Sequence, residues 1–76
     1  MRLHFSKTVE ANDVFQDLPH AKIGAITLRT RPNVEILVDM YDDATPSQIQ
    51  SVIDKAKTKD MTLILKEPGT FVVKGS

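Results

Sequence analysis

The stretch 34-VEILVDMYDDATPSQIQSVIDKAKTKDMTLIL-65 decides the fold, because it predicts a strand, a capped helix and a second strand in succession. Val34–Tyr41 is rich in apolar and β-branched residues, which favour strands, and Met61–Leu65 is a second short apolar run. Between them, Thr45–Gln48 has the residues of a helix start. The threonine hydroxyl can cap the helix, the proline suits its first position, and the glutamine can complete a capping box.

The residues after this start follow the period of a helix. Apolar side chains recur at intervals of three and four, which places them on one face: Ile49, Val52, Ile53 and Ala56. Lysines near the expected end at Thr58 complement the negative end of the helix dipole. No glycine follows to mark the C-terminus. The pattern therefore predicts one amphipathic helix packed on a sheet.

The chain before this stretch predicts two more strands. Arg2–Val9 begins with alternation, so that Leu3 and Phe5 point to one face and His4 to the other. The connection Glu10–Lys22 is 13 residues long, enough for a crossover between parallel strands, and contains a short possible helix starting at Asn12.

Ile23–Thr30 reads as the second strand, although Gly24 can mark a bulge. Arg31-Pro32-Asn33 predicts a tight turn, which makes the second and third strands an antiparallel hairpin. After the fourth strand, Glu67–Thr70 predicts another turn, and Phe71–Lys74 a short terminal strand paired with the fourth.

The whole chain, residues 1–76, is expected to form a single small α+β domain. Its element order predicts a ferredoxin-like β-α-β-β-α-β split sandwich with an added short C-terminal strand, and places the first strand between the third and fourth. The alternative is a curled antiparallel sheet with one main helix, in which the first two strands pair directly. This alternative applies if the segment from Asn12 is only a loop.

Composition limits the function classes. The chain is 41% hydrophobic and 26% charged, as in ordinary globular proteins. It has no apolar run long enough to cross a bilayer and no signal-peptide core, so we expect no membrane contact. The absence of cysteine excludes disulfides and thiolate metal sites and favours a cytoplasmic location. Ten basic residues balance ten acidic ones, which argues against nucleic-acid binding and weakens self-repulsion.

The polar candidates do not form a catalytic pattern. Asp39, Asp42 and Asp43 could hold a hard cation, but carboxylates before a helix are commonly solvated and favour its positive end. The two histidines, His4 and His20, have no carboxylate or metal-ligand spacing attached to them. We therefore expect no enzyme activity, no metal and no cofactor.

Three basic residues lie around the second strand and its turn. Lys22, Arg29 and Arg31 could contact phosphate, but the chain has only four aromatic residues to stack on bases. A solvated hairpin is the simpler interpretation, and nucleic-acid binding is the weakest of the functional hypotheses.

The most informative feature is apolar. If Val34, Ile36, Val38 and Met40 face the helices, the opposite sheet face carries the remaining apolar residues, and we expect an interface there: Leu37, Tyr41, Ile64 and Leu28. In the fourth strand, Leu63 and Leu65 are expected to face the core. Ile26 and Leu28 share one face of the second strand, and their place opposite the helices depends on Gly24 not shifting the register. A covering segment or a register error is the competing explanation.

The sequence thus predicts a small non-catalytic interaction module that binds a protein partner or forms a homodimer. The alternative is a regulatory domain that binds a small ligand, by analogy with other split β-α-β domains.

Overall fold

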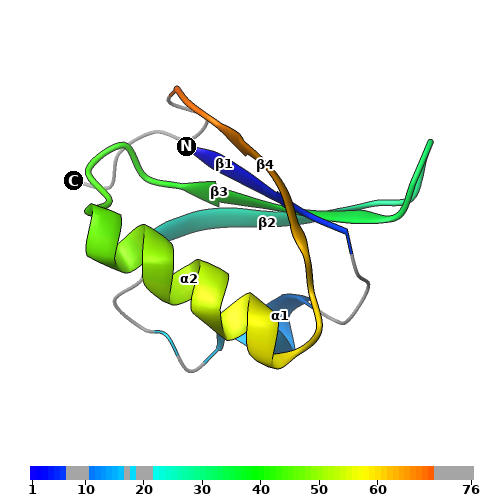
Figure 1. Cartoon of the computed structure of the whole chain (residues 1–76). Helices are drawn as coiled ribbons and strands as arrows, with labels where there is room; N and C mark the ends of the chain where they lie inside the picture. Colours follow the sequence, from blue (N-terminus) through cyan, green and yellow to red (C-terminus); the bar gives the residue numbers. More distant parts are fainter. Residues whose placement is uncertain (7–10, 17, 19–21, 70–76) are drawn as a thin grey trace.

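The computed structural model describes residues 1–6, 11–16, 18 and 22–69 (Figure 1). These residues form a small α+β fold with a four-stranded antiparallel open sheet, in the order β2-β3-β1-β4, and one main helix. The elements, in chain order, are β1 (Arg2–Phe5), α1 (Ala11–Phe15), β2 (Ile23–Arg29), β3 (Glu35–Met40), α2 (Pro46–Thr58) and β4 (Leu63–Glu67).

The predicted α+β class is confirmed, and an antiparallel sheet with one main helix corresponds to the alternative architecture. The direct pairing of the first two strands that accompanied this alternative does not occur, because β3 lies between β2 and β1. The expected place of the first strand, between the third and the fourth, is confirmed. The expected terminal strand Phe71–Lys74 lies outside the described residues.

The predicted start of the main helix is confirmed in detail. The hydroxyl oxygen of Thr45 accepts a hydrogen bond from the backbone N–H of Gln48 at 3.2 Å, and the Gln48 side chain accepts one from the Thr45 N–H at 2.9 Å. Pro46 is the first helical residue and Thr58 the last, as expected. Asp60 has a φ of 60° just past the end, so an aspartate takes the left-handed position that glycine commonly fills.

The hydrophobic core lies between the sheet and the two helices. Ile36, Val38 and Met40 are fully buried and face the helices, which confirms the expected parity of β3. Leu3 and Phe5 of β1 are buried as well. The core also includes the apolar side of both helices and one residue after α2: Val14, Phe15, Val52, Ile53, Ala56 and Met61. Val34, expected to join this row, precedes β3 and is exposed.

The register of β2 changes at Gly24. Ile23 lies opposite Met40, whereas Ala25 lies opposite Asp39, so Gly24 is an extra residue in the strand. An extra residue breaks the regular alternation of side chains between the two sheet faces. The residues beyond it point to the face opposite to the one that regular alternation predicts. Ile26 and Leu28 therefore lie on the helix side, opposite Val38 and Ile36. Their place on the other face was expected only if Gly24 did not shift the register, and the observed shift overturns it.

A second irregularity lies between β1 and β4. Phe5 is opposite Leu63, but His4 is opposite Leu65, which leaves Ile64 without an opposite residue. Leu63 packs against the core as expected. The prediction that Leu65 also faces the core is wrong, because the shift places it beside His4 on the other face.

Candidate functional site

Both helices lie on one side of the sheet, and no helix covers the other side in the described part of the chain (Figure 1). We call this second side the open face. Directly opposed residues in an antiparallel sheet point to the same face, so the register assigns its residues to rows. The first row contains Ala25, Asp39, Arg2 and Glu67, the second Thr27, Leu37, His4 and Leu65, and the third Arg29 and Glu35.

Arg2 and Asp39 form an ion pair in the first row. The Arg2 Nε donates to Asp39 Oδ1 at 2.5 Å, and a second guanidinium nitrogen lies 3.3 Å from Oδ2. The hydrogen bond to Asp39 raises the pKa of Arg2 against the opposing effect of desolvation. Glu67 lies opposite Arg2 on its other side and adds a favourable charge interaction. Arg2 therefore links β3 and β4 electrostatically across β1.

His4 lies at the centre of the open face with a carboxylate at each ring nitrogen. Its Nε2 is 2.9 Å from Glu67 Oε2, and its Nδ1 is 3.5 Å from Glu35 Oε1. The His4 residue is only 7% exposed. Arg29 completes the connection on the far side, because its guanidinium donates to Glu35 Oε2 at 2.7 Å. We call Arg29, Glu35, His4 and Glu67, which join all four strands, the His4 network.

The hydrogen bond from Arg29 is the main reason that the pKa of Glu35 is lowered. Partial burial opposes this shift, while the charge of Arg29 and the contact with His4 support it. Glu35 is thus held as a carboxylate between a guanidinium and an imidazole. The sequence analysis did not find the His4 network, because neither Glu35 nor Glu67 lies at a recognisable spacing from His4 along the chain.

The four expected interface residues do not form one patch. Leu37 is on the open face but is only 7% exposed, and Tyr41 is half-buried after the end of β3. Ile64 is 54% exposed on β4, and Leu28 is 58% exposed on β2. Because β2 and β4 are the two edges of the sheet, Ile64 and Leu28 lie on opposite sides of the molecule. Leu65, which was expected in the core, is 50% exposed next to Ile64.

The three candidate phosphate contacts are not brought together. Lys22 precedes β2 and its Nζ lies 3.4 Å from Asp43 Oδ2, whereas Arg29 ends β2 and pairs with Glu35. Lys22 and Arg29 are seven steps apart along an extended strand, which corresponds to a Cα separation of roughly 23 Å. Arg31 is exposed at the hairpin tip. Two of the three charges are therefore compensated by carboxylates, and they lie at opposite ends of a strand.

The acidic residues also separate. Asp39 pairs with Arg2 and Asp43 with Lys22, while Asp42 lies beside a pocket. Among the described residues, no group of three or more His, Asp or Glu is arranged to hold a metal ion. His20 lies outside the described residues. No helix in the described part of the chain is long and apolar enough to cross a membrane.

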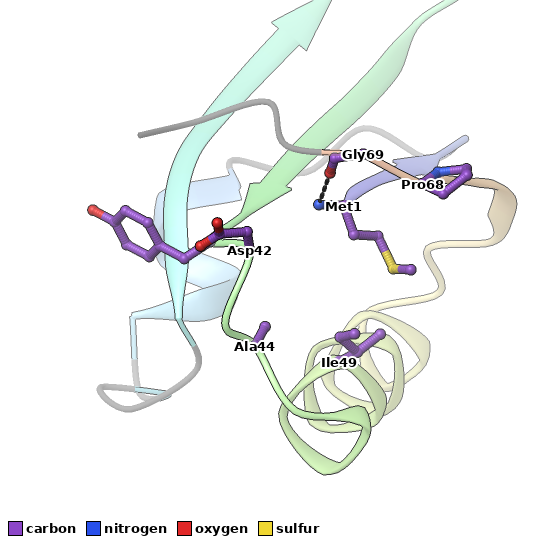
Figure 2. Close-up of a pocket in the computed structure, with 7 residues that line it drawn as sticks. Met1, Asp42, Ala44, Ile49, Pro68 and Gly69 are labelled. Carbon is purple, nitrogen blue, oxygen red and sulfur yellow. Dashed lines mark hydrogen bonds between the residues drawn. The ribbon is translucent and has the colours of Figure 1, made fainter. Parts of the chain in front are cut away.

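A pocket of about 290 Å³ lies where the start of α2 meets one end of the sheet. Figure 2 shows the lining side chains of Met1, Ala44, Ile49 and Pro68, together with Asp42 and Gly69. The Met1 amino group donates to the Gly69 carbonyl oxygen at 2.6 Å. The pocket therefore offers apolar surface with carboxylate and carbonyl acceptors beside it.

Comparisons with models of protein families, with curated proteins and with solved structures found no match to this chain.

Proposed function

We propose that this chain is a protein-interaction module that self-associates through the edge strand β4. The observation that carries the proposal is the pair of adjacent, half-exposed apolar residues on that strand, Ile64 and Leu65. Within the described residues, only β1 pairs with β4, so the outer side of β4 has no strand partner. An exposed apolar edge strand is a template for pairing with another strand.

The open face itself is the weaker candidate for this interface. Leu37, the apolar residue at the centre of this face, is already covered by neighbouring side chains, so a partner would remove little further apolar surface from water there. The charged groups around it, among them Glu35 and Asp39, already have partners within the fold. The apolar surface still accessible to a partner is at the sheet edges.

A second copy is the occupant that the sequence of β4 favours. If two copies pair antiparallel along β4 about a two-fold axis near Ile64, the exposed Ile64 and Leu65 of each copy lie beside those of the other. The antiparallel arrangement separates Lys66 of one copy from Lys66 of the other, so that no like charges meet across the axis. The formal net charge of zero also minimises repulsion between copies. Association would stabilise a domain whose core is small.

We also propose a ferredoxin-like split β-α-β arrangement for the chain. Its support is the succession of elements together with the strand order, in which β1 lies between β3 and β4. The additional strand expected at Phe71–Lys74 would compete with a second copy for the outer side of β4. The two possibilities predict different masses in solution.

The test is the absolute mass of the protein by size-exclusion chromatography with light scattering over a concentration series. We expect a dimer that Ile64→Lys and Leu65→Lys dissociate, because a lysine on an edge strand opposes pairing. Leu28→Lys is the matched control, since Leu28 is equally exposed on the other edge. It should leave the dimer intact, and circular dichroism should show all three variants folded.

Two results would contradict the proposal. A monomer at all concentrations would exclude self-association and make the segment 70–76 the next candidate for the β4 edge. A dimer that Leu28→Lys dissociates, but the two β4 variants do not, would move the interface to β2.

The pocket supports a second candidate function, the binding of a small molecule. Its volume is near the lower end of the range for ligand sites, and its apolar lining with a few polar groups is typical of them. A ligand bound there should raise the melting temperature in a screen of small metabolites. Ile49→Trp, which fills the pocket, should abolish the shift. A complete screen without any shift would count against this function.

A further inference from the structure

Among the described residues, the charges on the open face balance only if His4 is protonated. Apart from His4, the described part of this face carries two cations and three anions: Arg2, Arg29, Glu35, Asp39 and Glu67. One negative charge is therefore left uncompensated. Uncompensated charge is costly where side chains are shielded from water, and the side chains of His4 and Glu35 are only 9% and 11% exposed.

The geometry around the ring leads to the same protonation state. Both ring nitrogens of His4 face carboxylate oxygens, which only accept hydrogen bonds. A neutral imidazole carries one N–H, so its other nitrogen would direct a lone pair at a carboxylate. The imidazolium carries two N–H groups and can donate toward both Glu35 and Glu67.

We propose that protonated His4 is a pH-operated clasp that holds the edge strand β4 on the sheet. Glu67 belongs to β4, and its contact with His4 fixes the end of this five-residue strand to β1. The register irregularity lies directly beside His4, so the backbone pairing that holds β4 is interrupted there. Loss of the proton removes one charge-assisted contact and leaves two carboxylates beside a neutral ring. β4 then opens more readily.

The direction of the pH effect follows from the linkage between proton binding and the closure of β4. If the closed form holds a proton that the open form releases, closure is favoured at low pH and weakens as pH rises. Histidine side chains titrate in the physiological range. Coupling to a single proton changes the opening equilibrium by at most about tenfold per pH unit.

The test is amide hydrogen exchange of Leu63–Glu67 between pH 5.5 and 8.5, corrected for the intrinsic exchange rate. The buried helix residues Val52 and Ile53 serve as the internal reference. We expect the opening of β4 to increase with pH in the wild type and in His20→Gln, and to be independent of pH in His4→Gln. The opening of β4 can also be measured in the Ile64→Lys variant, in which the proposed dimer is expected to be dissociated. The test of the clasp therefore does not depend on the proposed self-association.

Glu67→Gln provides a second variant, because the Glu67 side chain is 41% exposed and its replacement leaves the core intact. It should reduce the pH dependence of β4 opening. The proposal is overturned if β4 opening does not depend on pH in the wild type. It is also overturned if opening depends on pH in His4→Gln and Glu67→Gln as strongly as in the wild type.

Discussion

Phe15 anchors the short helix α1, and its removal is the most direct test of how the core is built. α1 has five residues, too few to be stable through helix propensity alone. Its position must therefore come from Val14 and Phe15, which are buried in the core. The Phe15 ring packs against Phe5 with a centroid distance of 6.2 Å and an interplanar angle of 41°.

Phe15→Ala should cost about 3–5 kcal/mol of unfolding free energy, as for other buried phenylalanines. A domain of 76 residues is expected to have about 4–11 kcal/mol in total. This substitution therefore removes a large share of the stability. Phe15→Leu keeps part of the apolar volume and should cost about 1–2 kcal/mol, which lowers the melting temperature by about 4–16 °C.

Urea denaturation followed by circular dichroism measures these losses, with Gln16→Ala as the exposed control on the same segment. The control should change the unfolding free energy by less than about 0.5 kcal/mol. A double-mutant cycle with Phe5→Leu should give a coupling of about 0.5–1.5 kcal/mol for the ring contact. If Phe15→Leu were as mild as Gln16→Ala, α1 would not be docked on the core.

Three further predictions concern the cap, the acid limb and the end of α2. Thr45→Ala removes the capping hydroxyl and should cost about 1 kcal/mol in thermal unfolding, whereas Thr45→Ser should cost much less. Because the pKa of Glu35 is lowered, its contribution to stability is present above its ordinary pKa and is lost as pH falls through the folded value. Urea denaturation from pH 2 to 7 should therefore show a smaller acid loss for Glu35→Gln than for the wild type. Asp60→Gly relieves a left-handed aspartate and should raise the melting temperature, whereas Asp60→Val should lower it by more.

The parts of the fold that were predicted correctly depend on neighbours in the sequence. The start of α2 uses groups three residues apart, and its buried stripe repeats within two turns. The hairpin of β2 and β3 follows from the turn at Arg31-Pro32-Asn33. Each of these signals is complete within a short window of the chain.

The incorrect predictions depend on how the strands align with one another. Gly24 was identified as a possible bulge, but only its alignment with β3 shows that Ile26 and Leu28 lie on the helix side. The contact between His4 and Glu67 spans 63 residues. The sequence shows which strand positions carry charged residues. Which of these residues lie opposite one another depends on the register of the strands. Because the edge irregularities in β2 and β4 displaced the expected patch, the candidate site was only partly predictable.

The extra residue at Gly24 also divides β2 into two parts that are aligned from different ends. Ala25–Arg29 is aligned by the hairpin turn, whereas Ile23 is aligned by its place beside Met40. A residue gained or lost just before β2 can therefore be absorbed at the bulge. The core contact of Ile26 would be preserved through such a change. The chain is thus expected to tolerate variation in length before β2 better than within the hairpin, which makes this connection the suitable place for a grafted loop.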